Sequence, residues 1–150
     1  MGYTAHMNFP IHKAANALAT VQDSTQLLTK LTDLEYAQPD NTDPRWQRLP
    51  SNTTLNLQFN RLTKISELQL TALRYTISSY YPPAEVEVLG SIKKAAAFIQ
   101  GRNKISYKIS FPPTNITQLR IKLSGVDPIP AGHFAAGGKS WLLLDELVIN

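Results

Sequence analysis

Apolar and polar residues alternate with a period of two along much of this chain. The alternation occupies five runs, at residues 55–59, 68–71, 85–88, 105–111 and 119–123. Successive side chains of a β-strand point to opposite faces, so each run predicts a strand that buries one face and exposes the other. Such strands form antiparallel sheets, and two sheets that share one core accommodate all of them. The pattern therefore predicts an all-β protein built as an antiparallel β-sandwich.

Prolines separate these runs. The chain has ten prolines, and the pairs Pro82–Pro83 and Pro112–Pro113 both follow apolar segments. Proline cannot donate to a sheet ladder, so this distribution is typical of a loop-rich β protein. One helix is predicted over residues 25–31, where Asp23 or Ser24 would cap it and leucines share a face. Residues 94–100 fit a strand or a short helix, and their neighbouring strands favour a strand.

The last apolar run, Trp141 to Ile149, is interrupted by Asp145 and Glu146. A buried carboxylate is costly unless a cation or several hydrogen-bond donors meet it, so we expect a specific partner for this pair. Adjacent residues of a strand point to opposite faces, and we therefore expect that the two carboxylates do not face each other. That arrangement does not suit glycoside hydrolysis, which needs facing carboxylates.

Composition restricts the classes of function. The 150 residues are sufficient for one domain with a proper core, and the chain has no cysteine for disulfides, zinc thiolates or a nucleophile. The formal charge is +4, and the basic residues are spread through several segments, which predicts no nucleic-acid interface. No apolar stretch is long enough for a transmembrane segment. The only histidines are His6, His12 and His133, no catalytic motif is present, and we expect no enzymatic activity.

The two ends of the sequence suggest how the domain begins and where it belongs. Residues 1–13 are expected to be a disordered or tag-derived lead, so that His6 and His12 lie outside the domain of residues 14–150. The start has no basic region followed by an apolar one, so no signal peptide is predicted. Because the chain also stops on its last strand, we expect a domain taken from a longer polypeptide.

Three passages resemble one known family in their order and spacing. They are LTDLEYAQPDNTDPRWQRL at 31–49, SSYYPPAEVEVLGS at 78–91 and IPAGHFAAGGKSWLLLDELVIN at 129–150. Together they are similar to the discoidin-like domain, or coagulation factor 5/8 type C domain, which overlaps carbohydrate-binding module family 32. The nearest versions accompany bacterial glycoside hydrolases of the β-hexosaminidase type. The resemblance covers residues 14–150 and implies a jelly-roll β-sandwich of the galactose-binding-domain-like kind.

The resemblance also implies a structural calcium ion (Ca²⁺) near the rim of the sandwich. In the family, backbone carbonyls, an early acidic residue and a late glutamate hold this ion, and the matching positions here are Asp33 and Glu146. Calcium takes about six to eight oxygen ligands, so carbonyls of residues 31–43 would have to contribute. Leu34 stands where the family has glycine, which puts the backbone path in doubt. Alternatively, Asp33 caps a turn and Glu146 pairs with an arginine.

The sugar site implied by the resemblance depends on aromatic and polar side chains in loops. Sugars present C–H faces that stack on rings and hydroxyls that need hydrogen-bonding partners. Pro82–Pro83 would stiffen the loop before them, and a rigid loop binds with a lower ordering cost. The tryptophans Trp46 and Trp141 are expected in the core instead. The candidate ligand-binding residues are Tyr36, Tyr80, Tyr81, His133 and Phe134.

The sequence thus predicts a non-catalytic carbohydrate-binding module of a secreted or cell-surface bacterial glycosidase, located outside the cell or in the periplasm. Its ligands would be terminal galactose, N-acetylgalactosamine (GalNAc) or N-acetylglucosamine (GlcNAc) residues of glycans, as the family implies. The alternative is a structural spacer domain that packs against the catalytic domain and binds no sugar. Attachment to anionic lipid through Phe134 near Lys139 is a third reading.

Overall fold

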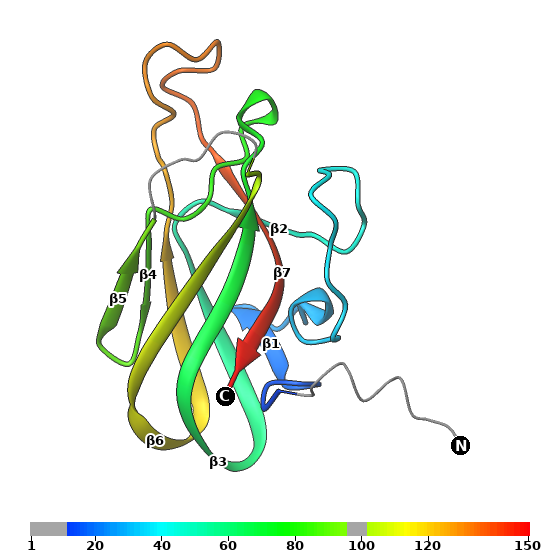
Figure 1. Cartoon of the computed structure of the whole chain (residues 1–150), viewed down its shortest axis with the longest axis vertical. Helices are drawn as coiled ribbons and strands as arrows, with labels where there is room; N and C mark the ends of the chain where they lie inside the picture. Colours follow the sequence, from blue (N-terminus) through cyan, green and yellow to red (C-terminus); the bar gives the residue numbers. More distant parts are fainter. Residues whose placement is uncertain (1–11, 96–101) are drawn as a thin grey trace.

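The computed structural model describes residues 12–95 and 102–150, and within them the fold is an antiparallel β-sheet without an α-helix (Figure 1). The strands, in chain order, are β1 (Leu18–Val21), β2 (Gln47–Pro50), β3 (Thr53–Leu73), β4 (Glu85–Val88), β5 (Ser91–Lys94), β6 (Lys104–Ser124) and β7 (Trp141–Ile149). Two single-turn 3-10 helices, η2 (Thr29–Leu31) and η3 (Thr76–Ser78), lie in the connections. The predicted all-β class is confirmed.

Two long strands, β3 and β6, hold the sandwich together. They pair with each other from Thr53↔Leu123 to Leu73↔Lys104, with register shifts in the middle where both strands bend. The first half of β3 also pairs with β1, and its second half pairs with β7. One layer is therefore β1, β3, β6, β4 and β5, and the other is β2, β7, β3 and β6. Figure 1 shows β3 and β6 curving through both layers.

The core lies between these layers and is built from the alternating apolar positions. Leu55 and Leu57 of the first half of β3 and Leu68 and Leu70 of its second half are all at most 1% exposed. They belong to one cluster with apolar residues of β4, β6 and β7. The period of two therefore identified the buried face of each strand correctly. It did not show that residues 53–73 and 104–124 are single strands, with Pro112–Pro113 inside β6.

Of two local predictions, one is wrong and the other falls mostly outside the described residues. The helix predicted over residues 25–31 is wrong, because Leu27 forms an extended bridge with Thr20 and only η2 is helical. Ser24 does accept a hydrogen bond from the Gln26 N–H, but this bond caps a turn. Lys94 ends β5, and most of the ambiguous 94–100 segment lies outside the described residues.

The predicted lead of residues 1–13 also extends too far, because it includes His12 and Lys13. His12 is 5% exposed, and the Lys13 N–H donates to the Ile149 carbonyl at 2.8 Å, so both residues belong to the fold. Residues 1–11 of that lead lie outside the described residues. Among the residues that the structure describes, no helix has the length and apolar character required to span a membrane.

Candidate functional site

Two segments meet at one end of the sandwich, beside the start of β7. The first is the 74–84 segment, which contains η3 and closes on itself through reciprocal backbone bonds between Tyr75 and Tyr80 at 3.0 and 3.1 Å. Two backbone hydrogen bonds then attach this segment to β7. The Tyr81 N–H donates to the Trp141 carbonyl at 3.1 Å, and the Trp141 N–H donates to the Ser79 carbonyl at 2.9 Å. The residues before Pro82–Pro83 are therefore fixed on the sheet.

The second is the 125–140 loop, which extends beyond the sheet in Figure 1. Its two arms are joined by backbone bonds of 2.9 Å from the Ile129 N–H to the Gly138 carbonyl and from the Gly137 N–H to the Ile129 carbonyl. Ile129 is 2% exposed and anchors the loop. The Ser140 hydroxyl donates to the Val126 carbonyl at the loop base. These contacts give the loop a defined shape without disulfides.

His133 joins the two segments. Its Nε2 lies 2.5 Å from the Thr76 carbonyl oxygen, and its Nδ1 accepts a hydrogen bond from the Ala135 N–H at 3.0 Å. A carbonyl can only accept, so Nε2 carries the hydrogen and the imidazole is neutral in this network. Both ring nitrogens are therefore used inside the protein, and His133 contributes to the site through its ring faces and its position.

Three rings form an aromatic cluster at this end, namely Tyr81, His133 and Phe134. The His133 and Phe134 rings are stacked, with centroids 4.4 Å apart and an interplanar angle of 26°. Tyr81 meets His133 edge-on at 6.2 Å and 63°. Phe134 is 83% exposed, and Ile77, which follows the carbonyl that His133 contacts, is 69% exposed. The cluster thus presents an apolar ring surface to solvent on a fixed support. Sequence reasoning missed Ile77, which no motif distinguishes.

The other two candidate sugar residues lie elsewhere. Tyr80 is half-buried and packs on a small second core with Trp46, Leu73 and Leu143, so it supports the 74–84 segment from below. Tyr36 lies in the 32–46 loop, which Figure 1 shows well apart from the 125–140 loop. The structure therefore brings together Tyr81, His133 and Phe134 and does not bring Tyr36 to them.

Asp145 and Glu146 do not obey the strand alternation. Leu70 of β3 pairs with Leu147, whereas Ala72 pairs with Leu144, so two residues of β7 stand opposite Thr71 alone. This is a β-bulge, and it keeps both Leu144 and Leu147 in the core. Asp145 and Glu146 then both face away from the core, toward the 32–46 loop. The expectation that they point to opposite faces is wrong because the extra residue interrupts the period of two.

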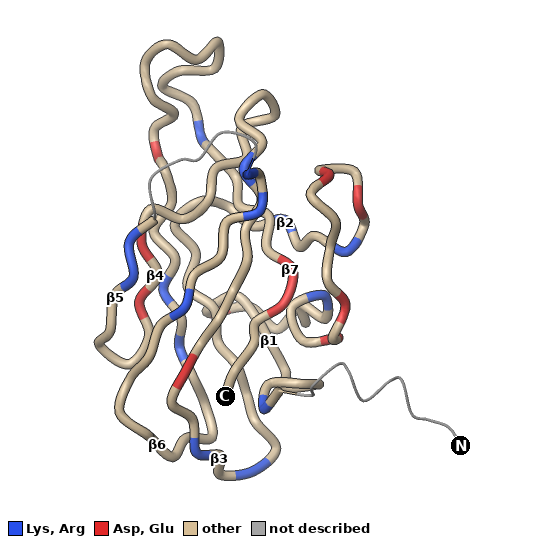
Figure 2. Tube along the Cα trace, viewed as in Figure 1, with Lys and Arg blue, Asp and Glu red and all other residues tan. Residues whose placement is uncertain are grey.

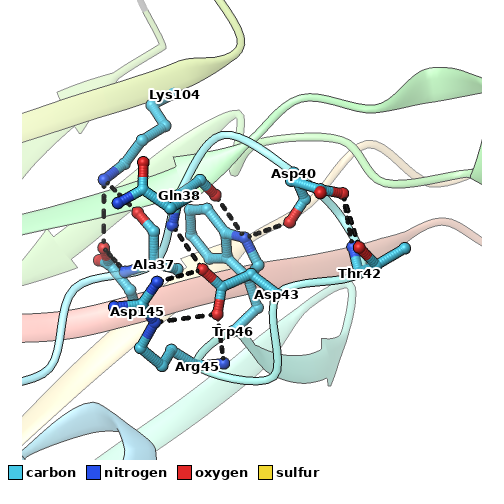
Figure 3. A network of polar contacts seen from close by, with 9 residues as sticks. All are labelled: Ala37, Gln38, Asp40, Thr42, Asp43, Arg45, Trp46, Lys104 and Asp145. Atoms are coloured by element: carbon cyan, nitrogen blue, oxygen red, sulfur yellow. Dashed lines mark hydrogen bonds and ion pairs between the residues drawn. The ribbon is translucent and has the colours of Figure 1, made fainter.

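Asp145 fixes the middle of the 32–46 loop (Figure 3). Its Oδ2 accepts a hydrogen bond from the Ala37 N–H at 3.3 Å and lies 3.6 Å from Lys104 Nζ, which also donates to the Ala37 carbonyl. Its Oδ1 accepts from the Glu146 N–H at 2.6 Å. Burial raises the pKa of Asp145, and these donors and Lys104 offset only part of that effect. Asp145 has the donors and the cation that its burial requires.

The same loop closes around Trp46, which is 4% exposed and confirms the expected core position. Its Nε1–H donates to the carbonyls of Gln38 and Asp40 at 3.0 and 2.9 Å (Figure 3).

Trp141 is only partly buried, and the Arg48 guanidinium lies 3.8 Å from its ring centroid. Figure 2 shows Lys and Arg along several strands and loops, not gathered on one element.

Glu146 faces the N-terminal part of the domain. Its Oε2 lies 2.7 Å from His12 Nε2, and its Oε1 accepts a hydrogen bond from the Leu34 N–H at 3.1 Å. Burial raises the pKa of Glu146, and the hydrogen bond from His12 lowers it in part. His12, Glu146 and Tyr36 line a cavity of about 310 Å³, and burial and the two carboxylates raise the pKa of Tyr36.

These contacts bear on the predicted calcium ligands. Asp33 Oδ1 accepts from the Glu35 N–H at 3.0 Å and so caps a turn, and Glu146 meets a histidine where an arginine was the alternative. Leu34 adopts φ +65°, the left-handed region that favours glycine, so the backbone path survives the substitution. No group of three or more His, Asp or Glu side chains in the described ranges could hold a metal ion. Asp33 and Glu146 thus both meet N–H groups of the protein, and calcium binding stays a prediction of the sequence.

Solved structures of known proteins identify the fold. No family model matches the sequence, and no curated protein matches it. The structure is similar to the family 32 carbohydrate-binding module of NanJ from Clostridium perfringens in complex with galactose, with 12% identity, 93% of this chain and 96% of that chain covered, and a TM-score of 0.52. It is also similar to CpGH89CBM32-5 from the same organism in complex with GalNAc-β-1,3-galactose, with 11% identity, coverage of 91% and 96%, and a TM-score of 0.50. The chain therefore has the β-sandwich fold of family 32 carbohydrate-binding modules, over nearly its whole length.

Proposed function

We propose that this domain is a non-catalytic carbohydrate-binding module whose ligand site is the aromatic cluster of Tyr81, His133 and Phe134. The observation that carries the proposal is the Phe134 ring, 83% exposed and stacked on His133. An exposed ring on a support fixed by hydrogen bonds can bind the C–H face of a sugar without the cost of ordering a loop.

The polar partners for sugar hydroxyls come from the same end of the sandwich. Tyr81 has a hydroxyl and a partly buried ring next to His133. Tyr81 also lines a mainly apolar cavity of about 400 Å³ with Pro82, Ile105 and Val126. A pyranose that stacks on Phe134 would lie in the same aromatic cluster as Tyr81, whose hydroxyl is the proposed partner for a sugar hydroxyl.

Terminal galactose, GalNAc or GlcNAc is the proposed ligand class. The support is the resemblance of residues 31–49, 78–91 and 129–150 to the family, together with the fold, since the NanJ module and CpGH89CBM32-5 were solved in complex with galactose and with GalNAc-β-1,3-galactose. The domain would be part of a secreted or cell-surface bacterial glycosidase and would hold that enzyme near its glycan substrate. A weak individual site is sufficient for this role because the linkage raises the effective concentration of the enzyme.

The test is a glycan array followed by isothermal titration calorimetry on the 150-residue chain. We expect binding to galactose- or N-acetylhexosamine-terminated glycans, weakened about tenfold or more by Phe134→Ala, as for a hot-spot residue. Leu62→Ala is the matched control, because Leu62 is also an exposed apolar residue (66%) but lies in the middle of β3. Equal affinities of the two variants would refute the cluster as the site.

The spacer alternative is supported by a different surface. Leu18 of β1 and Leu27 are 48% and 49% exposed and line one groove of about 450 Å³ with polar residues of β3 and β6. Such a surface suits packing against a neighbouring domain. A folded sample that binds no glycan and no anionic vesicles, and whose affinity for a catalytic domain falls on Leu18→Ser, would favour this function over sugar binding.

A further inference from the structure

The buried Glu146 carboxylate faces N–H donors where a calcium ligand would face a cation. The side chains of His12 and Glu146 are 3% and 0% exposed and meet at 2.7 Å, and the second Glu146 oxygen receives the Leu34 N–H. Calcium gathers oxygen lone pairs around itself, whereas an N–H group presents its positive end. We propose that His12 fulfils the structural role expected of a calcium ion, so that Glu146 is not a metal ligand and the fold is independent of calcium.

The hydrogen bonds of the His12 ring define this role. Its Nδ1 accepts from the Ala14 N–H at 3.1 Å and lies 3.4 Å from the Ile149 N. Backbone N–H groups can only donate, so Nδ1 is the acceptor and Nε2 carries the hydrogen given to Glu146. The imidazole is thus fixed by hydrogen bonds at both nitrogens and acts as a directed donor to the carboxylate.

This arrangement joins three parts of the chain that are distant in sequence. His12 belongs to the first described segment, Leu34 to the 32–46 loop and Glu146 to β7, and the Lys13 N–H also donates to the Ile149 carbonyl at 2.8 Å. A metal ion bound between loop and closing strand would make the same connection. In this chain the His12 side chain of the N-terminal segment makes it.

The experiment compares thermal unfolding of the 150-residue chain in excess EGTA and in millimolar calcium. We expect the same Tm in both, because calcium cannot stabilise the folded state if that state has no calcium site. A calcium site filled at about 1,000 times its dissociation constant would raise the Tm by many degrees. A higher Tm in calcium that Glu146→Gln abolishes would overturn the proposal.

Variants test whether His12 is responsible. His12→Ala should lower the Tm by several degrees in EGTA, whereas Lys13→Ala, which removes the neighbouring exposed side chain, should leave it nearly unchanged. His12→Gln keeps an N–H donor within reach of Glu146 and should fall between wild type and His12→Ala; it also serves if His12→Ala does not fold. Equal Tm values for wild type, His12→Gln and His12→Ala would overturn the assigned role. The test does not depend on sugar binding.

Discussion

Asp145 and Glu146 face the same loop although they are neighbours on β7, and the Glu146 N–H donates to Asp145 Oδ1 at 2.6 Å. The bulge opposite Thr71 makes this possible, because it takes both side chains out of the core alternation. One carboxylate then receives the Ala37 N–H and the other the Leu34 N–H, so the two together fix the 32–46 loop on the sheet.

Asp145→Ala should destabilise the domain by about 2 kcal/mol, because the buried Ala37 N–H would lose its acceptor. Urea unfolding measures the loss. Glu67→Ala is the control, since Glu67 forms an ion pair with Lys108 at 3.4 Å in which the side chains are 24% and 61% exposed. Exposed ion pairs contribute about 0.5 kcal/mol, so this variant should resemble wild type. Equal losses for both variants would show that the bulge carboxylate does not fix the loop.

The sequence predicted most of the strands because their signal is local. Alternation in residues 55–59 or 119–123 depends only on which face of one strand is buried. The continuity of β3 and the bulge in β7 depend on pairing with strands far along the chain, which no local pattern contains. The same holds for His12, whose partner Glu146 is 134 positions away. His12 was assigned to the disordered lead only because it lies near the N-terminus.

The candidate site shows the same division. His133 and Phe134 are adjacent, so their stacking needs only the local loop, and the resemblance named both. The approach of Tyr81 depends on the bond between His133 and the Thr76 carbonyl, which follows from how two loops leave the sheet. Tyr36 was named by its type and its family position, but the loop that carries it packs on Glu146 and not on the cluster.

Acid should selectively remove the contribution of Asp43. Arg45 donates to both of its oxygens and the Gln38 N–H to Oδ2, and these bonds lower the pKa of Asp43 well below 3.8. A lowered folded-state pKa gives stability that is present above the unfolded pKa and is lost as the pH falls through the folded one. Asp43→Asn should therefore have a lower Tm than wild type at pH 7.

The difference between the two Tm values should shrink as the pH falls below about 4, because the unfolded chain then binds a proton at Asp43 that the folded protein does not yet bind. Asp145 and Glu146, whose pKa values are raised, titrate in both proteins and cancel in the difference. Differential scanning calorimetry from neutral to acid pH provides the measurement. A difference that stays constant with pH would contradict the assignment of the effect to the Asp43 carboxylate.

The turn between β4 and β5 contains a correctable strain. Leu89 and Gly90 connect the strands with φ values of +50° and +81°, and Leu89 is 43% exposed. Asparagine tolerates the left-handed region better than leucine and is preferred in two-residue hairpin turns. Leu89→Asn should stabilise the domain by about 0.5–1 kcal/mol, which raises the Tm by about 2 °C.

Gly90→Ala is the opposite test at the same turn. An added Cβ would meet no atom within 4 Å, so its cost comes from the backbone conformation alone. We expect a loss of about 1 kcal/mol. If Leu89→Asn lowered the Tm, the packing of the leucine side chain would outweigh its backbone strain.

Tyr107 supports the loop that carries Tyr81. It is 1% exposed, and its hydroxyl donates to the buried Pro83 carbonyl at 2.5 Å. Burial raises the pKa of Tyr107, so the hydroxyl stays protonated and able to donate. Its hydrogen bond therefore reaches the Pro82–Pro83 pair from inside the sandwich, two residues beyond Tyr81.

Tyr107→Phe should leave the core packing intact and destabilise the domain by about 1–2 kcal/mol, because the Pro83 carbonyl loses its donor in a dry environment. If this bond also positions Tyr81, the variant should bind glycan more weakly at temperatures where it is fully folded. Calorimetric titration beside urea unfolding separates the two effects. Reduced stability with unchanged affinity would restrict Tyr107 to the fold, whereas unchanged stability would contradict the contribution assigned to the Pro83 hydrogen bond.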